Sequence, residues 1–315
     1  MKYVRLGNSG LFITELTFGS ALTIGTEIED QETADSIIDK AWELGIRSFD
    51  VANFYGNGKA EVMLGRALAK YPRQEFVIAT KCARPVGDSP YHKGLSRKHI
   101  LWALDESLRR LGMDYVDLYY AHRYDETVPM SEIAGTFNDL IRRGVVRYWG
   151  TSEWPLQALQ ECHNLCDERF LEKPIVEQFI YSYAVQKSVT SGVKEFCDSH
   201  GMGTIGFSPL CQGYLTGKYK SGVPSSSRIA KQDSINYHKT SNFYSQYGER
   251  IDYFLETCEK FNCSPTATAL LWCLRKKVFP VFGASSLVQL EENVLGLSKN
   301  IPDACWESLE SFSNS

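Results

Sequence analysis

Four side chains with complementary chemistry stand at or near the ends of short β-rich segments. Asp50 lies in the last part of one such segment and Tyr55 just beyond it, and Lys81 and His122 stand at the ends of the next two. A free tyrosine titrates near pH ~10, but an ammonium group beside it favours the phenolate and lowers that pKa. We therefore expect Lys81 to prepare Tyr55 as a general acid. Asp50 would keep Lys81 charged and oriented, and His122 would direct a carbonyl oxygen toward the acid.

This group of side chains holds no hydride, so reduction of a carbonyl compound would require a cofactor that carries one. Taken singly, each residue has a structural explanation, because Asp50 and Lys81 could be a buried ion pair and His122 a hydrogen-bonded scaffold residue. A second enzymatic alternative is a Schiff base between Lys81 and a carbonyl substrate. Borohydride trapping of substrate on Lys81 would distinguish that enzyme from a reductase.

Short β-rich segments alternate along the chain with segments whose apolar residues recur at helical spacing. The predicted strands are 16–20, 47–53, 76–82, 116–122, 146–152, 174–182, 204–209 and 279–285. The predicted helices are 33–44, 59–70, 96–111, 131–142, 155–166, 189–199, 265–276 and 287–297. This strict alternation predicts a parallel sheet, and eight units predict closure into an α/β fold of the (β/α)8 TIM barrel type, with residues 1–315 as a single domain. Polar residues gather at the C-terminal ends of these strands, where such barrels carry their catalytic groups.

Two segments lie outside the alternation. Val4 and Leu6 on one side of an Asn-Ser-Gly turn, with Leu11 and Ile13 on the other, predict an N-terminal β-hairpin that plugs an apolar surface. After the seventh strand, a long segment rich in Ser, Gly, Lys and Tyr runs from Pro209 to a predicted helix near Glu249. Loops of this length inside compact domains usually have a function, and we expect this one to be a lid over the site.

Composition excludes several classes of function. The net charge of −4 and the pI of about 5.9 leave no basic footprint for a nucleic acid or an anionic membrane. The nine cysteines are scattered without a C-x-x-C pair, and no stretch approaches the length of a membrane span or a signal sequence. We expect reduced thiols and a cytoplasmic location. The six histidines form no H-E-x-x-H motif, so no metal site is predicted, and a hydrolase is disfavoured because G-x-S-x-G is absent.

The stretch 201–206 (GMGTIG) satisfies the G-x-G-x-x-G pattern of dinucleotide-binding loops. That fingerprint must follow a strand and open a helix. Here a predicted helix precedes the glycines and a predicted strand follows them. We therefore interpret them as helix C-cap and turn residues.

The chain resembles the aldo-keto reductases along nearly its whole length. The motifs that carry this resemblance are FDVANFYG (49–56), GKAEVMLG (58–65), ATK (79–81), DLYYAHR (117–123), GASS (283–286) and QLEEN (289–293). Within the family it is most similar to the branch containing the voltage-gated potassium channel β subunits, through GLSRKHI (94–100), YWGTS (148–152), WCLR (272–275) and the loop ending at Arg228. Those β subunits carry Asn where this chain has His122, which favours a competent reductase.

The resemblance implies a catalytic tetrad of Asp50, Tyr55, Lys81 and His122 and a bound NADPH, with NADH as the alternative because Gln289 stands where many members have Arg. The cofactor-binding residues it implies are Ser20, Asp50, Ser152, Gln178, Phe207, Ser208, Leu210, Gln212, Lys218, Arg228, Gly283, Ser285, Gln289, Glu292 and Asn293, with Glu27 a weaker match. The candidate substrate-binding residues are Leu22, Phe54, Tyr55, Arg84, His122, Trp154 and Tyr214.

The expected reaction is reversible reduction of an aldehyde or ketone, with sugars, keto sugars, pyridoxal-like aldehydes and aryl aldehydes as candidate substrates. The expected partner is this small carbonyl compound, without nucleic acid or membrane insertion. Relatives on this branch form oligomers, so a homo-oligomer is considered, although no sequence feature demands it. The alternative function is a nicotinamide-binding sensor or channel-associated regulatory subunit with slow turnover.

Overall fold

The computed structural model describes the chain except for residues 221, 223–226, 228–229, 231–234 and 314–315. Eight parallel strands close into a barrel in the order β10-β3-β4-β5-β6-β7-β8-β9. Their bounds are β3 Thr17–Gly19, β4 Ser48–Asp50, β5 Val77–Cys82, β6 Val116–Ala121, β7 Val146–Ser152, β8 Val176–Ile180, β9 Gly203–Phe207 and β10 Phe279–Phe282. The (β/α)8 TIM barrel predicted from the alternation is therefore confirmed, with each strand inside its predicted range or beginning one residue before it.

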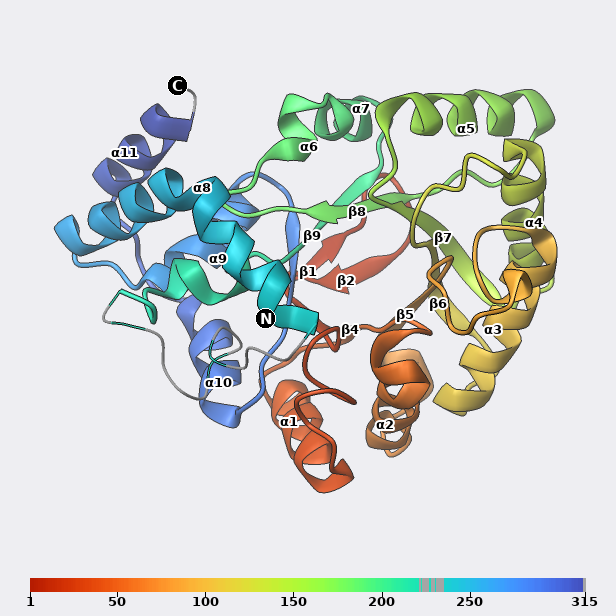
Figure 1. Cartoon of the computed structure of the whole chain (residues 1–315), viewed down its shortest axis with the longest axis horizontal. Helices are drawn as coiled ribbons and strands as arrows, with labels where there is room; N and C mark the ends of the chain where they lie inside the picture. Colours follow the sequence, from red (N-terminus) through yellow and green to blue (C-terminus); the bar gives the residue numbers. More distant parts are fainter. Residues whose placement is uncertain (221, 223–226, 228–229, 231–234, 314–315) are drawn as a thin grey trace.

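Helices surround this ring of strands (Figure 1). They are α1 Gln31–Glu43, α2 Lys59–Leu68, α3 Arg97–Leu111, α4 Met130–Arg142, α5 Leu156–Arg169, α6 Lys187–Thr190, α7 Val193–Ser199, α8 Ile235–Lys260, α9 Pro265–Arg275, α10 Leu287–Gly296 and α11 Asp303–Ser313. Several begin at a side-chain cap of the expected kind, such as Ser96, which accepts a hydrogen bond from the His99 amide. Their apolar faces bury Phe49, Phe137 and Trp149 between the helices and the barrel.

The helices differ from the sequence prediction in three places. Gly192, with φ of +77°, ends α6 and begins α7, where one helix was predicted. Helix α8 begins at Ile235, earlier than the predicted helix near Glu249, because 235–249 lacks the apolar spacing that marks a helix. Helix α11 was not predicted. It packs on α8, where the Tyr253 hydroxyl donates to the Ser308 carbonyl at 3.0 Å.

The N-terminal hairpin plugs the barrel where the strands begin (Figure 1). Strands β1 (Tyr3–Arg5) and β2 (Phe12–Thr14) pair antiparallel. Leu6 and Ile13 are buried in one cluster with residues that point into the barrel, among them Leu118 and Ile205. The predicted apolar plug is confirmed.

The glycines of 201–206 explain how the hairpin fits. A side chain on Gly203 would overlap Leu6, and one on Gly7 would overlap the Gly201 carbonyl. The backbone N–H of Asn8 donates to that same carbonyl at 2.8 Å. Gly201 lies in the turn after α7, whereas Gly203 and Gly206 belong to β9, so the interpretation as turn residues is correct for Gly201 alone. Because a strand and not a helix follows Gly201, the stretch is not a nucleotide-binding loop.

No helix in the described part of the chain is both long enough and apolar enough to cross a membrane. All nine cysteines are free, and eight of them are buried.

Candidate active site

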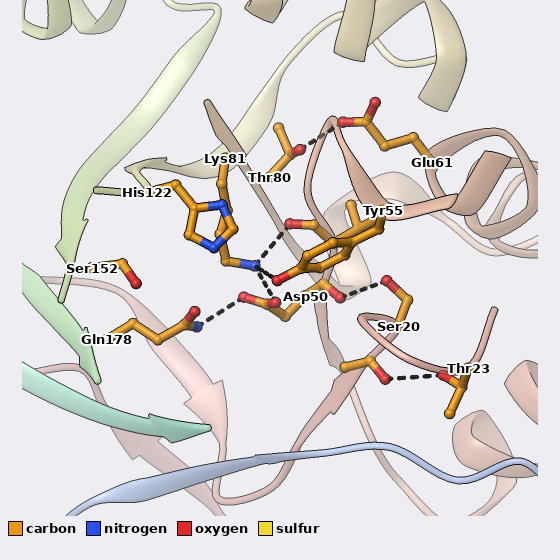
Figure 2. Close-up of polar contacts among 12 residues, drawn as sticks. Ser20, Thr23, Asp50, Tyr55, Glu61, Thr80, Lys81, His122, Ser152 and Gln178 are labelled. Atoms are coloured by element: carbon orange, nitrogen blue, oxygen red, sulfur yellow. Dashed lines mark hydrogen bonds and ion pairs between the residues drawn. The ribbon is translucent and has the colours of Figure 1, made fainter. Parts of the chain in front are cut away.

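Lys81 is the centre of the polar group that the strands bring together (Figure 2). Its ammonium group is fully buried and donates to the Asp50 carboxylate, to the Val51 carbonyl at 2.9 Å and to the Tyr55 hydroxyl at 3.4 Å. Asp50 ends β4 and Lys81 lies on the adjacent β5, so the parallel pairing of these strands sets the contact. The structure thus brings the predicted acid, phenol and ammonium together.

A tight turn holds Tyr55 above the end of β4. Residues Tyr55–Gly58 form a short 3₁₀ turn in which Gly56 and Asn57 adopt left-handed backbone angles. A side chain on Gly56 would overlap the Gly25 carbonyl, so this position requires glycine. The turn directs the Tyr55 hydroxyl down toward Lys81 (Figure 2).

A second group of polar contacts holds β5 on the side that faces the helices. The Thr80 hydroxyl donates to the buried Glu61 carboxylate at 2.6 Å, and Arg110 donates to the other oxygen of Glu61 at 2.6 Å. This ion pair ties β5 to α2 and α3. Because side chains alternate across a strand, holding Thr80 outward directs its neighbour Lys81 into the barrel.

His122 follows β6 and lies beside the phenol. Its ring centre is 6.0 Å from that of Tyr55 and 5.3 Å from that of Phe54. It is 5% exposed, and its Nδ1 has no hydrogen-bond partner among the described residues. Burial lowers the pKa of this imidazole well below its usual value, and the cationic groups of Lys81, Arg123 and Arg84 lower it further. His122 is therefore neutral and has hydrogen-bonding capacity for a substrate oxygen.

Burial raises the pKa of the Tyr55 hydroxyl above its usual value, even though the nearby Lys81 ammonium acts to lower it. The sequence-based expectation that Lys81 would lower this pKa is wrong in its net direction, because desolvation outweighs the charge. For Lys81 itself, burial acts to lower the pKa, but the Asp50 carboxylate and the Tyr55 hydroxyl together outweigh burial and raise it. Lys81 is thus charged, and the phenol keeps its proton.

Gln178 and Ser152 continue the polar group on the next strands. They are register partners on β8 and β7, and both are buried. The Gln178 amide donates to the second oxygen of Asp50 at 3.0 Å (Figure 2). On the other side, the Ser20 hydroxyl donates to the Asp50 carbonyl at 3.1 Å. These contacts place Ser20 and Gln178 against Asp50, with Ser152 beside Gln178.

Further candidate cofactor residues follow β9. Phe207 ends this strand and is half-buried, and Ser208 and Gln212 adopt left-handed angles with φ of +58° and +56°. The Gln212 amide donates to the Ser208 hydroxyl at 2.8 Å. Leu210 is half-buried and Lys218 is exposed, while Arg228 lies outside the described residues.

The remaining candidate cofactor residues lie between β10 and the N-terminus of α10, at the end of the barrel where the strands stop, which is called its mouth below. Gly283 is exposed, and a side chain there would come within 3.2 Å of Thr23. The Ser285 amide and hydroxyl both donate to the Gln289 side chain, at 3.0 and 3.2 Å. Helix α10 also presents Glu292 at its surface, whereas Asn293 is buried.

The chemistry of these donors fits a nicotinamide dinucleotide. Phe207 offers an aromatic face, and Ser152 and Gln178 offer hydrogen-bonding groups for an amide. Gly283 has no side chain, and the N-terminus of α10 points its backbone amides toward the mouth although Ser286 caps the Gln289 amide. Both features suit close approach of a phosphate. Glu27, the weaker match, is half-buried and precedes α1.

The candidate substrate residues differ in how accessible they are. Leu22, Phe54 and Arg84 are half-buried near the mouth. Trp154 is 2% exposed and donates through its indole to the Ala121 carbonyl at 3.2 Å, and Tyr214 is 8% exposed. The last two are therefore buried supports of the mouth in this structure.

Sequence reasoning left Arg123 and Asn53 out of the candidate site. Arg123 donates to the Ser152 hydroxyl at 3.4 Å, and Asn53 is buried with no hydrogen-bond partner for either amide atom among the described residues. The available signal was position, since both residues stand at or just beyond the end of a predicted strand.

The fold and this polar cluster place the chain among the (β/α)8 barrels that carry their polar groups at the carboxyl ends of the strands. Residues 15–314 match the Aldo/keto reductase family. The chain belongs to this family of oxidoreductases, which generally act on small carbonyl compounds with a nicotinamide cofactor. The resemblance inferred from the motifs is confirmed.

Similar curated proteins carry names that refer to potassium channels. A "putative voltage-gated potassium channel subunit beta" of Schizosaccharomyces pombe is 36% identical over 296 residues, covering 92% of this chain and 86% of that protein. A "probable voltage-gated potassium channel subunit beta" of Arabidopsis thaliana is 36% identical over 299 residues, covering 93% and 90%. One of Oryza sativa subsp. japonica, with the same name, is 34% identical over 302 residues, covering 94% and 91%.

Proposed function

We propose that this protein reduces an aldehyde or ketone to the alcohol with NADPH, and that Tyr55 is the general acid. The observation that carries the proposal is the position of the Lys81 ammonium group, which hydrogen-bonds to both the Asp50 carboxylate and the Tyr55 hydroxyl in a buried site. This arrangement keeps a protonated phenol at a fixed place and supplies positive charge where an alkoxide would develop.

Each residue of the tetrad has a separate task in this reaction. Neutral His122 orients the carbonyl oxygen of the substrate. Tyr55 transfers its proton to that oxygen as negative charge builds on it, and the Lys81 ammonium stabilises the resulting phenolate. Asp50 holds Lys81 charged, and Gln178 fixes the second oxygen of Asp50 at 3.0 Å.

The bound cofactor would supply the hydride that the side chains lack. We propose that Ser20, Asp50, Ser152 and Gln178 hold its nicotinamide end and that Phe207 stacks on the ring. The remaining contacts would come from Ser208, Leu210, Gln212, Lys218, Arg228, Gly283, Ser285, Gln289, Glu292 and Asn293. NADPH is favoured by the family, and NADH run in parallel tests the preference.

The substitution Tyr55→Phe tests the acid. We expect it to keep NADPH binding and to lower kcat by roughly 10²–10⁴-fold. The matched control is Tyr71→Phe, because the Tyr71 hydroxyl bonds to Asp39 on the outer helices at 2.6 Å. Consumption of NADPH with sugar, aryl and aliphatic carbonyls measures both variants. Activity like that of the unmodified protein in Tyr55→Phe would refute the assignment.

A second candidate function is a channel-associated subunit with slow turnover, which the names of the three relatives favour. His122 supports the enzyme, because the imidazole would orient a carbonyl oxygen for Tyr55. Capture of a channel partner without measurable carbonyl reduction would favour the second function. A cytoplasmic location and a homo-oligomer stay predictions, testable by fractionation and by light scattering.

A further inference from the structure

Two arginines flank His122 at the mouth of the barrel. Arg84 follows β5 and Arg123 follows β6, so the pairing of these strands places both beside the imidazole. The Arg84 guanidinium lies 6.0 Å from the centre of the Phe54 ring, which itself contacts His122. Both guanidinium groups act on the pKa of His122. They therefore border the place where a carbonyl substrate would lie.

Neither arginine forms an ion pair with a described residue. Arg123 donates to the His122 carbonyl at 2.7 Å and to the Ser152 hydroxyl at 3.4 Å, both neutral acceptors. The Nε of Arg84 is buried and has no hydrogen-bond partner in the described part of the chain. Partly buried cations normally find an anionic partner, so two unpaired ones side by side require an explanation.

The nearby carboxylates form no ion pair with Arg84 or Arg123 in the described part of the chain. Burial and the neighbouring Arg84 lower the pKa of the Arg123 guanidinium, and the Glu153 carboxylate opposes this shift only in part. Glu153 accepts a hydrogen bond from the Ile180 amide at 2.6 Å. Burial raises the pKa of the Glu177 carboxyl to about 8, so at neutral pH this group is mostly uncharged. The Asp125 carboxylate accepts hydrogen bonds from the Leu95 amide at 2.8 Å and from the Thr127 hydroxyl at 2.6 Å.

The space beside Arg123 is open. A pocket of about 390 Å³ is lined by Arg123 and also by Ala83, Pro85, Lys93, Tyr124 and Asp125. Its exposed Lys93 adds another positive charge. In the ring of eight strands, β5 and β6 lie opposite β9 and β10, which carry the proposed phosphate contacts of the cofactor. The two arginines are thus on the other side of the mouth from those phosphate contacts.

We propose that Arg84 and Arg123 bind an anionic group of the substrate, so that the preferred substrates are aldehydes or ketones that carry a carboxylate or a phosphate. Guanidinium groups match the oxygens of both anions in bidentate geometry. The inference rests on the proposed reductase function and specifies its substrate class.

Matched pairs of carbonyl compounds test this proposal. Benzaldehyde is compared with 4-carboxybenzaldehyde, and glyceraldehyde with glyceraldehyde 3-phosphate, by NADPH consumption. We expect kcat/KM to be roughly 10- to 100-fold higher for at least one anionic member than for its neutral partner. The two pairs distinguish a carboxylate from a phosphate.

Substitution of the arginines locates the effect. Arg84→Met and Arg123→Met should each lower the ratio of anionic to neutral kcat/KM by about 10-fold or more, mainly through KM, and Lys in place of Arg should restore part of it. Arg142→Met, at the exposed end of α4, is the matched control. NADPH binding by fluorescence checks that each variant is folded.

The outcomes separate this proposal from the proposed function. Ratios near one for both substrate pairs, or ratios that neither arginine substitution changes, would overturn the anion site while leaving the reductase intact. No reduction of any neutral or anionic carbonyl would instead overturn the reductase.

Discussion

At the end of the barrel where the strands begin, the hairpin packs Leu6 and Ile13 against other apolar side chains. At the end where the strands stop, Asp50, Lys81 and His122 are buried, and some polar atoms there have no described partner. Burying charged groups costs stability unless each is well paired, whereas apolar packing contributes it. The end where the strands begin, called the lower end below, therefore stabilises the fold. The end where the strands stop, called the upper end, carries the candidate catalytic groups.

The largest effect is expected at the upper end, from Lys81→Met. It should lower kcat by roughly 10²–10⁴-fold and also reduce stability by about 3–5 kcal/mol, because Asp50 would be left charged and unpaired in a buried site. Turnover and urea unfolding measure the two effects. The control is Lys70→Met, since Lys70 pairs with Asp39 in an exposed position. An unchanged unfolding midpoint would contradict the buried pair.

At the lower end, Leu6→Ala should lower the free energy of unfolding by about 2–5 kcal/mol, because it opens a cavity in the plug. We expect kcat at a temperature where the variant is folded to stay unchanged. Tyr3→Ala, on the exposed side of the same hairpin, is the control and should have little effect. A fall in kcat without a fall in the free energy of unfolding would contradict the assignment of stability to the lower end and of chemistry to the upper end.

A smaller effect is expected at the upper end from substitution of Phe207, which we propose stacks on the cofactor. Loss of its ring in Phe207→Ala should weaken NADPH binding by roughly 2- to 10-fold, the range expected for an aromatic stacking contact of ~0.5–1.5 kcal/mol. Phe207→Tyr keeps an aromatic face and serves as the control. Fluorescence titration measures the Kd, and equal values for the two variants would exclude stacking.

The smallest effect concerns acid stability near the lower end. Burial lowers the pKa of His163 from 6.5 to about 4, and its Nε2 lies 3.1 Å from Met202 Sδ. As pH falls below 6.5, His163 becomes protonated in the unfolded chain, whereas in the folded protein it stays neutral until about pH 4. Stability therefore falls across this window.

Replacing this histidine should reduce that loss. In His163→Gln the melting temperature should fall less steeply between pH 6.5 and 4, while His92→Gln, outside this cluster, should follow the unmodified protein. Thermal melts across the window measure the slopes, and parallel curves for all three proteins would contradict the prediction.

Much of the barrel could be predicted from the sequence because its strands and helices alternate with clear spacing. The contact of Lys81 with Asp50 and Tyr55 was predicted because parallel strands bring their carboxyl ends to one edge. The net pKa direction of Tyr55 was not, because the depth of burial cannot be read from neighbours in the chain. The start of α8 was missed because 235–249 is polar and aromatic without helical spacing.

Arg123 shows a different limit of sequence reasoning. Its place after His122 was visible, but whether an acidic residue would neutralise it depended on side-chain directions. The Glu153 carboxylate accepts from the Ile180 amide instead of pairing with Arg123. Such choices among near neighbours are settled by packing and not by spacing.

The pairing of β3 with β10 has a consequence for synthesis of the protein. On one edge of β3, Thr17 and Phe18 pair with Val281 and Phe282, so this first barrel strand keeps that edge open until β10 has left the ribosome. At ~5–20 residues per second, that wait is on the order of tens of seconds. Closure of the ring thus depends on the last barrel strand to be synthesised, and until then the unpaired edge of β3 is exposed to pairing with other chains.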